Sequence, residues 1–243
     1  MTATIALPRQ PHSDWLARLR TVSMGILRVG RHTVIPPLMQ VRTFAPRAAV
    51  AGWWEVSGKT CVAVYQPKGA ASYAASLVNL ANPGTYDAAA GVAPTWAAGT
   101  GWTFDGTDDL LSNTVRLAYN YTVLVQLASW TGAACLSTST DDWHVYPNGS
   151  YGTKISLLHG GTWNEKAPNL QTGNIGIVAD DLYRDGALDQ AGTSGWTGTS
   201  AGDFLIGRAG LMYGAGSLLA LVIYSDTLTA GEVAAVSAAM AAL

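Results

Sequence analysis

A short acidic segment carries the densest group of metal-ligating side chains in the chain. From Phe104 the sequence reads Phe-Asp-Gly-Thr-Asp-Asp, so three carboxylates lie close together around a glycine. Oxygen ligands of this kind are those that Ca²⁺ prefers. Two interpretations stay open, a calcium site and an Asx-type turn whose carboxylates accept hydrogen bonds from neighbouring amides, and the turn is favoured. The three residues are Asp105, Asp108 and Asp109.

Aromatic residues beside polar loops form a second group. The chain has nine tryptophans and ten tyrosines, and several lie in or next to segments rich in Gly, Ser, Thr and Asn. There a ring face can stack on the CH groups of a sugar while amides bind its hydroxyls. For each ring taken singly, packing in the core or in a subunit interface is favoured over sugar contact. The candidate glycan contacts are Asp142, Trp143, Tyr146, Tyr151, Trp163 and Trp196.

Catalytic patterns are scarce. Retaining glycosidases need two carboxylates a few ångströms apart, and alternation along a strand would place such a pair on one face. None of the three glutamates, Glu55, Glu165 and Glu232, has an acid at that spacing. We expect no Gly-x-Ser-x-Gly nucleophile elbow and no His-Glu-x-x-His, Cys-x-x-Cys or phosphate-loop pattern. The isolated His144 and His159 predict no transition-metal site. We therefore expect no enzymatic activity.

Short strands must position these residues. Residues 121–127 are rich in β-branched side chains and predict a strand, and further strands are predicted at 133–138, 142–147 and 153–158. The segment Pro147-Asn148-Gly149 predicts a hairpin turn between the last two. Short strands at such spacing are typical of a sandwich or barrel.

The C-terminal third has a more specific order of elements. A strand at 174–179 leads into a hairpin at Asp185-Gly186, because both central residues of a tight turn need positive φ. Strands are predicted at 204–208 and 216–224. A helix is predicted to open at Thr229, with Glu232 at the spacing of a capping box.

These motifs resemble LamG-type concanavalin A-like jelly rolls. The matching phrases are Leu-Tyr-x-Asp-Gly from Leu182, Ile-Gly-Arg from Ile206, Leu-Thr-x-x-Glu-Val from Leu228 and the acidic segment at Phe104. The run from Cys61 to Trp102 is similar to the corresponding part of LamG-like proteins of tailed bacteriophages and prophages. The resemblance covers about residues 53–243. It implies an all-β fold, an antiparallel β-sandwich with a short C-terminal helix, and it leaves activity open, because this fold serves lectins, glucanases, adhesion modules and virion proteins.

The N-terminal segment has a different composition. Residues 1–50 carry seven arginines against the single acid Asp14, a net charge of +6, whereas the remainder carries −8. A short amphipathic helix is predicted at 13–28, and five prolines favour extended backbone elsewhere. We interpret 1–50 as a basic arm and 51–243 as the jelly-roll domain. The predicted anchoring residues are Arg9, Trp15, Arg18, Arg20, Arg28, Arg31, Arg42 and Arg47.

Other features exclude some partners. No apolar stretch approaches the roughly 18 residues of a membrane span. The acidic body, and the lack of aromatic residues interleaved with the arginines, argue against nucleic acid. No cofactor other than calcium is suggested. Whether Cys61 and Cys135 form a disulfide stays open, with free thiols favoured.

Three functions follow, in order of preference. The first is a non-enzymatic structural protein of a phage-like virion, a capsid decoration, head-fibre or tail component assembled in the host cytoplasm. Its arm would bind sister subunits or other virion proteins. The second is a module that binds cell-surface or environmental polysaccharide, which can coexist with the first. The third is a glycoside hydrolase.

Overall fold

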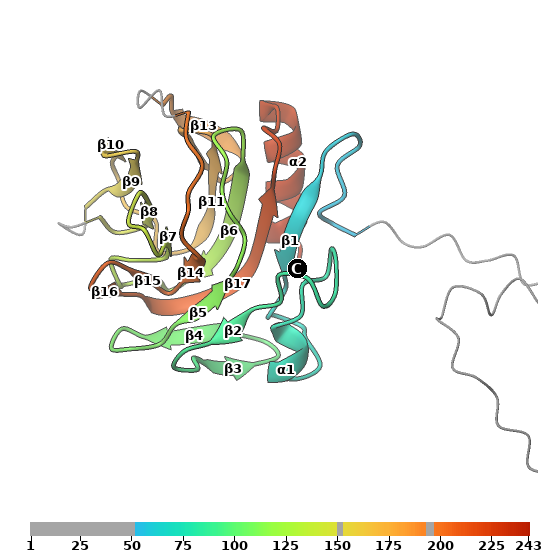
Figure 1. Ribbon diagram of the computed structural model, residues 1–243. Coiled ribbons are helices and arrows are strands. Elements are labelled where there is room, and N and C mark those ends of the chain that lie inside the picture. Colours follow the sequence, from blue (N-terminus) through green and yellow to red (C-terminus); the bar gives the residue numbers. More distant parts are fainter. Residues whose placement is uncertain (1–51, 150–152, 193–196) are drawn as a thin grey trace, which may run out of the picture. The chain divides into compact units, whose positions relative to one another are not determined.

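A computed structural model describes residues 52–149, 153–192 and 197–243 of the chain. The described residues form two antiparallel β-sheets that face each other, with a helix at the C-terminal end (Figure 1). The expected all-β sandwich with a short C-terminal helix is confirmed. The predicted arm and its boundary at residue 50 lie outside the described residues. No helix in the described ranges is long and apolar enough to cross a membrane.

The larger sheet, sheet I, has eight strands, seven of them in the order β13-β12-β11-β6-β17-β4-β3, and β1 also pairs with β17. All of its pairings are antiparallel. Its strands are β1 (Cys61–Tyr65), β3 (Thr95–Ala97), β4 (Gly101–Asp105), β6 (Thr122–Ala128), β11 (Gly173–Val178), β12 (Asp181–Arg184), β13 (Ala187–Gln190) and β17 (Ala215–Tyr224).

The second sheet, sheet II, has seven strands in the order β10-β9-β8-β7-β14-β5-β2. A two-stranded ribbon, β15 (Arg208–Ala209) and β16 (Met212–Tyr213), lies beside β7, where the Ser137 hydroxyl donates to the Arg208 carbonyl at 2.7 Å. The strands of sheet II are β2 (Ala89–Ala90), β5 (Leu111–Asn113), β7 (Leu136–Thr138), β8 (Trp143–Tyr146), β9 (Ile155–His159), β10 (Thr162–Lys166) and β14 (Phe204–Ile206).

Two helices complete the described elements, α1 (Tyr73–Ser76) and α2 (Ala230–Ala241). The predicted capping box of α2 is confirmed. The Thr229 side chain accepts from the Glu232 amide, and the Glu232 carboxylate accepts from the Thr229 amide at 2.7 Å. These reciprocal bonds satisfy two donors that a helix start would otherwise leave unpaired.

The hairpin predicted at Asp185-Gly186 is also confirmed. Arg184 pairs with Ala187 across a two-residue turn, and both turn residues have positive φ, 48° for Asp185 and 85° for Gly186. A turn with positive φ at both central positions suits the twist of the strands it joins. The local sequence therefore determines this connection.

The central strand β6 shows how the core is layered. Its side chains alternate, so that Val123, Val125 and Leu127 enter the core between the sheets, while Leu124 points to the opposite face. On that opposite face Leu124 joins a second apolar cluster, in which Val233 and Met240 are side chains of α2. Helix α2 therefore covers the part of the outer face of sheet I formed by β6, β11 and β13.

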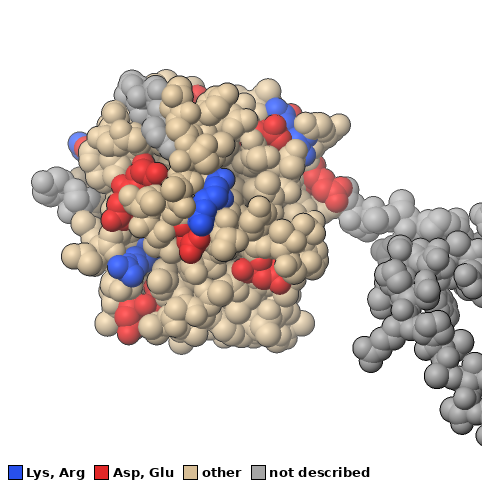
Figure 2. All heavy atoms as spheres, viewed as in Figure 1, with Lys and Arg blue, Asp and Glu red and all other residues tan. Residues whose placement is uncertain are grey.

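Two further features describe the domain. Cys61 and Cys135 are unbridged, and burial raises the pKa of Cys61 to about 12, so that it stays a thiol at neutral pH. On the face shown in Figure 2, charged side chains lie singly or in small groups among uncharged residues.

Candidate functional site

Alternation along β8 decides which of its aromatic residues are accessible. Trp143 and Val145 belong to the core between the sheets, and His144 and Tyr146 lie on the outer face of sheet II. Trp143 is fully buried, and its indole N–H donates to the Tyr121 hydroxyl. The prediction that Trp143 contacts glycan is therefore wrong, because the strand directs this ring into the core.

Strand register brings the next aromatic residue beside Tyr146. The β8–β9 and β9–β10 pairings align Tyr146 with Ser156 and Ser156 with Glu165. Trp163 lies two residues before Glu165, on the same face of β10. The rings of Tyr146 and Trp163 lie 5.6 Å apart between centroids at 40°. Two residues predicted from separate segments thus form one aromatic pair.

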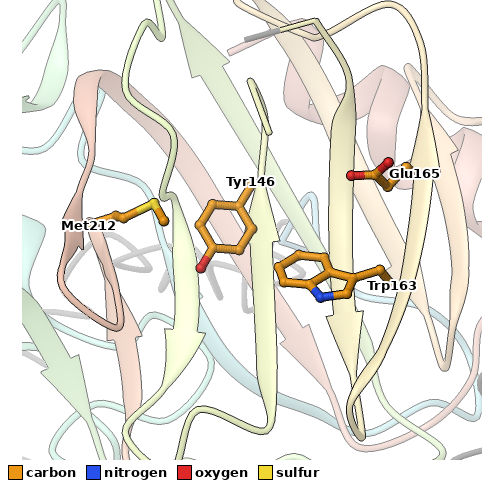
Figure 3. Close-up of a pocket in the computed structure, with 4 residues that line it drawn as sticks. All are labelled: Tyr146, Trp163, Glu165 and Met212. Carbon is orange, nitrogen blue, oxygen red and sulfur yellow. The ribbon is translucent and has the colours of Figure 1, made fainter. Parts of the chain in front are cut away.

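A hollow of about 320 Å³ opens beside this pair. Four described residues line it, Tyr146, Trp163, Glu165 and Met212. In Figure 3 the Tyr146 ring lies between the Met212 thioether and the Trp163 indole, so that the three side chains form a row across the strands. Trp163 is 49% exposed and Met212 44%, whereas Tyr146 is buried at the base. We call these four residues the hollow.

Glu165 is the charged member of the hollow. Its carboxylate forms an ion pair with the Lys154 ammonium at 3.0 Å and accepts from the Ser156 hydroxyl at 3.1 Å. Hydrogen bonding from Lys154, with a further contribution from Ser156, lowers the pKa of Glu165. The side chain is therefore a carboxylate at neutral pH and offers acceptor sites at the edge of the hollow.

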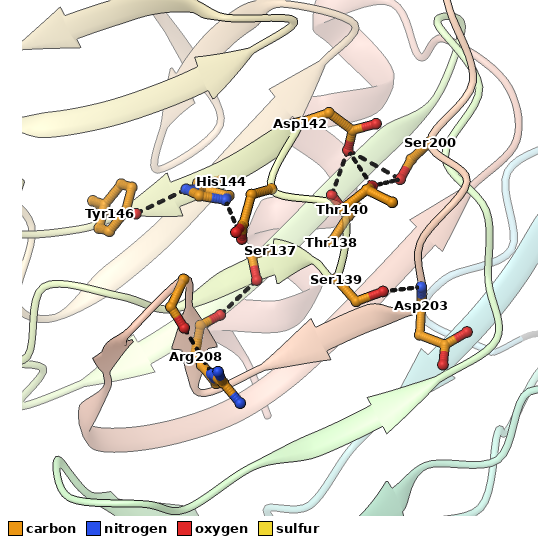
Figure 4. Close-up of polar contacts among 12 residues, drawn as sticks. Ser137, Thr138, Ser139, Thr140, Asp142, His144, Tyr146, Ser200, Asp203 and Arg208 are labelled. Carbon is orange, nitrogen blue, oxygen red and sulfur yellow. Dashed lines mark hydrogen bonds and ion pairs between the residues drawn. The ribbon is translucent and has the colours of Figure 1, made fainter.

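A chain of hydrogen bonds continues from Tyr146 along the outer face of sheet II. His144 is 2.8 Å through Nδ1 from the Tyr146 hydroxyl and 3.1 Å through Nε2 from an Asp141 carboxylate oxygen (Figure 4). Burial lowers the pKa of His144, and the nearby Asp141 raises it. The effect of burial is the larger, so the imidazole is neutral at pH 7. The hydrogen bond from the hydroxyl to His144 fixes the orientation of the Tyr146 side chain.

Comparison with known proteins identifies the fold. No family model matches the chain, and no curated protein matches it. Among solved structures, Trypanosoma rangeli sialidase with the inhibitor DANA has a TM-score of 0.52 at 13% identity, over 74% of this chain and 33% of the sialidase chain. A second similar structure is that of botulinum neurotoxin type C, a toxin whose cell entry depends on interaction with two ganglioside molecules. Its TM-score is 0.50 at 9% identity, over 74% of this chain and 51% of that chain.

A third similar structure is domain 4 of AbnA, an extracellular GH43 arabinanase from Geobacillus stearothermophilus, in complex with arabinotriose. Its TM-score is 0.49 at 15% identity, over 74% of this chain and 98% of that domain. This chain matches about a third of the length of the sialidase chain and about half of the length of the neurotoxin chain. The likeness to the sialidase and neurotoxin chains shows a shared fold.

Asp142, a predicted glycan contact, has a different setting. One of its carboxylate oxygens accepts hydrogen bonds from the hydroxyls of Thr138, Thr140 and Ser200, at 2.5, 3.0 and 3.1 Å (Figure 4). Burial raises the pKa of Asp142, but these hydrogen bonds together outweigh it and the pKa is lowered. Asp142 is not among the described residues that line the hollow, and its hydrogen bonds link β7 to two loops.

The expectation that the chain has no Gly-x-Ser-x-Gly pattern is wrong, because Ser200 lies at the centre of one. Residues 198–202 read Gly-Thr-Ser-Ala-Gly, the spacing of a hydrolase nucleophile elbow. Such an elbow needs a strand before the serine and a helix after it, and here Ser200 lies in a loop between an isolated bridge at Thr199 and β14. Its hydroxyl is buried against Asp142. The segment is a structural loop.

The acidic segment at Asp105 forms the predicted turn. The Thr107 amide donates to the Asp105 carboxylate at 2.7 Å, and the Asp105 amide donates to Asp109 at 2.8 Å. Ligand oxygens of Asp105, Asp108 and Asp109 lie within 4.8 Å of one another, close enough to share one cation. The Asx-type turn is confirmed, and a calcium ion here stays a prediction.

Several predicted residues lie outside the described residues: Tyr151 and Trp196 among the glycan contacts, and the arm residues Arg9, Trp15, Arg18, Arg20, Arg28, Arg31, Arg42 and Arg47. The structure therefore places two of the six predicted contacts, Tyr146 and Trp163, in one hollow. It adds Glu165 and Met212, which no local motif marks. Glu165 follows Trp163 by two residues on an edge strand, and this spacing was the available signal.

Proposed function

We propose that the domain binds carbohydrate, and that the hollow on the outer face of sheet II is its binding site. The observation that carries the proposal is the half-exposed Trp163 indole packed beside Tyr146 at the mouth of an open hollow. Covering a half-exposed tryptophan ring removes apolar area from water, which favours binding. The flat face of the ring fits the CH groups of a pyranose. Sites on strands also hold their side chains rigidly.

The polar group beside the rings fits the same ligand. Glu165 is ionised and adjacent to the Trp163 face, so it can accept hydrogen bonds from sugar hydroxyls while the ring holds the apolar face. The botulinum neurotoxin with a similar fold depends on gangliosides for cell entry, which is consistent with sugar recognition on such a sandwich.

We further propose that binding proceeds without catalysis. Glycosidases need a second carboxylate about 5 to 9 Å from the first, and Glu165 is the one carboxylate among the described residues of the hollow. Its lowered pKa suits a hydrogen-bond acceptor and disfavours the role of general acid. Incubation with neutral and acidic polysaccharides should release no reducing sugar.

Binding is tested on the full-length chain. Native affinity electrophoresis against a panel of arabinan, galactan, xylan, mannan, β-glucan and a sialylated glycoprotein, with and without calcium, should show retardation by at least one polysaccharide. The Trp163→Ala variant should lose the retardation. Tyr119→Ala provides a matched control, because Tyr119 is 53% exposed and does not line the hollow. An unretarded wild-type protein across the panel would contradict the proposal.

A second candidate function concerns the N-terminal arm. We propose that residues 1–50 anchor the domain to sister subunits or other proteins of a phage-like virion, assembled in a host cytoplasm, with the sandwich displayed. The supporting observation is the charge of +6 on this segment against −8 on the remainder. Light scattering on the full chain and on residues 47–243 tests it. Discrete oligomers formed by the full chain alone would support it, and identical behaviour of both would not.

A further inference from the structure

The direction of the hydrogen bonds that Tyr146 and His144 form limits what the Tyr146 hydroxyl can offer to a ligand. An ionised carboxylate can only accept, so the His144 nitrogen facing Asp141, Nε2, carries the proton. The other nitrogen, Nδ1, then presents a lone pair, and the Tyr146 hydroxyl donates its hydrogen to it at 2.8 Å. Tyr146 therefore has its hydrogen committed inside the protein, and its oxygen retains acceptor capacity alone.

Glu165 has the same character at the other side of the hollow. Each carboxylate oxygen accepts from one protein group, Lys154 on one and Ser156 on the other, and each keeps a further lone pair. The ammonium of Lys154 is already paired with this carboxylate at 3.0 Å. The charge of Lys154 is thus neutralised by the acid that lines the hollow.

Donors are scarce in the same place. Of the four described lining residues, Met212 has a thioether, Tyr146 and Glu165 accept, and Trp163 has the single side-chain N–H group. A ligand must therefore supply donors of its own. Sugar hydroxyls do so, whereas a carboxylate or sulfate group accepts and brings a negative charge beside Glu165.

We infer that the hollow selects uncharged, hydroxyl-rich sugars and discriminates against uronic, sialic and sulfated ones. The inference rests on the proposed carbohydrate binding and names its ligand class. Discrimination arises because an anionic group in the hollow would lose contacts with water and would find no cation among the four described lining residues. It would also face the Glu165 carboxylate, which has the same charge. Neutral chains meet acceptors that match their hydroxyls and rings that match their CH faces.

Matched pairs of ligands test the inference on the full-length protein. Calorimetric titration compares hexasaccharides of glucose, galactose and mannose with the same hexasaccharides oxidised to uronates at C6. We expect every neutral hexasaccharide that binds to do so at least tenfold more tightly than its oxidised counterpart at low salt. Glu165→Gln should narrow this gap severalfold, since it removes the like charge, adds an amide donor and frees Lys154.

Two further variants keep the result interpretable. Asp203→Asn removes an exposed carboxylate that is ion-paired with Arg116 at 2.7 Å and does not line the hollow, and it should leave the gap unchanged. Tyr146→Phe keeps the ring and removes an acceptor, so it should weaken neutral probes severalfold while preserving the preference. Equal or tighter binding of the oxidised probes overturns the inference and leaves carbohydrate binding intact. If no probe of either kind binds, both proposals fail.

Discussion

Two hairpin turns with the same backbone give a matched test of how the sandwich holds α2. Asp185-Gly186 joins β12 to β13, and Gly160-Gly161 joins β9 to β10. The second residue of each turn has nearly the same φ, 85° for Gly186 and 84° for Gly161. Their surroundings differ: a Cβ at position 186 would lie 3.0 Å from the Ala234 Cα of α2, and one at position 161 would meet nothing within 4 Å.

The expected losses follow from these contacts. An L-residue in the left-handed region costs about 1–2 kcal/mol. Both Gly161→Ala and Gly186→Ala should lower the free energy of unfolding by this amount, reduced slightly because alanine lowers the entropy of the unfolded chain. Only the Cβ at position 186 also crowds the helix, where it would lie 3.1 Å from the Ser237 Cβ as well. Overpacking of this kind typically costs about 1–3 kcal/mol. Gly186→Ala should therefore destabilise the domain by about 3 kcal/mol, roughly twice the loss in Gly161→Ala.

Urea unfolding followed by tryptophan fluorescence measures both variants against the parent. The midpoints should fall for both, further for Gly186→Ala, at an unchanged slope with denaturant. Equal losses of stability would mean that α2 shifts to accommodate the new methyl group without destabilising the domain. A larger loss in Gly161→Ala would refute the steric reasoning outright.

Three other perturbations have expected outcomes. Trp163→Ala should weaken the best glycan ligand by about thirtyfold in calorimetry, because covering roughly 100 Å² of the exposed indole contributes about 2 kcal/mol; unchanged affinity would place binding elsewhere. Thr229→Ala removes the capping box of α2 and should lower the free energy of unfolding by about 1 kcal/mol in urea, whereas a loss near zero would mean that water replaces the cap. Burial lowers the pKa of His159 from 6.5 to about 4, so the unfolded chain binds this proton more readily than the folded one. The stability from neutral His159 is thus complete above pH 6.5 and declines as the pH falls towards 4, and urea titrations at pH 7.0, 5.5 and 4.5 should show a smaller decline for His159→Gln than for the parent.

Elements governed by neighbouring residues were predictable from the sequence. The turn at Asp185-Gly186 depends on which residues tolerate positive φ, and the start of α2 depends on a side chain three residues from its cap. Both are local properties. The acidic segment at Asp105 likewise folds into the Asx-type turn because its donors and acceptors lie within a few residues of each other.

The hollow depends on relations that the sequence does not display. Trp143 and Tyr146 are three residues apart and so face opposite sides of one strand, which separates a core ring from a surface ring. Trp163 reaches Tyr146 through two successive strand pairings, and Met212 arrives from a ribbon far along the chain. Which faces are covered is decided by the packing of whole sheets, and no single window of sequence contains that information.

The position of β17 has a consequence for how the domain is made. This strand is the last of the chain, yet it lies inside sheet I, where it pairs with β1, β4 and β6. A nascent chain that lacks it holds β1 without its partner in the sheet, and holds β3 and β4 apart from β6 and its neighbours. Such unpaired edges favour association between incomplete chains. Sheet I can therefore close only after nearly all of the domain has left the ribosome, and premature termination upstream of β17 should yield aggregates rather than a smaller folded unit.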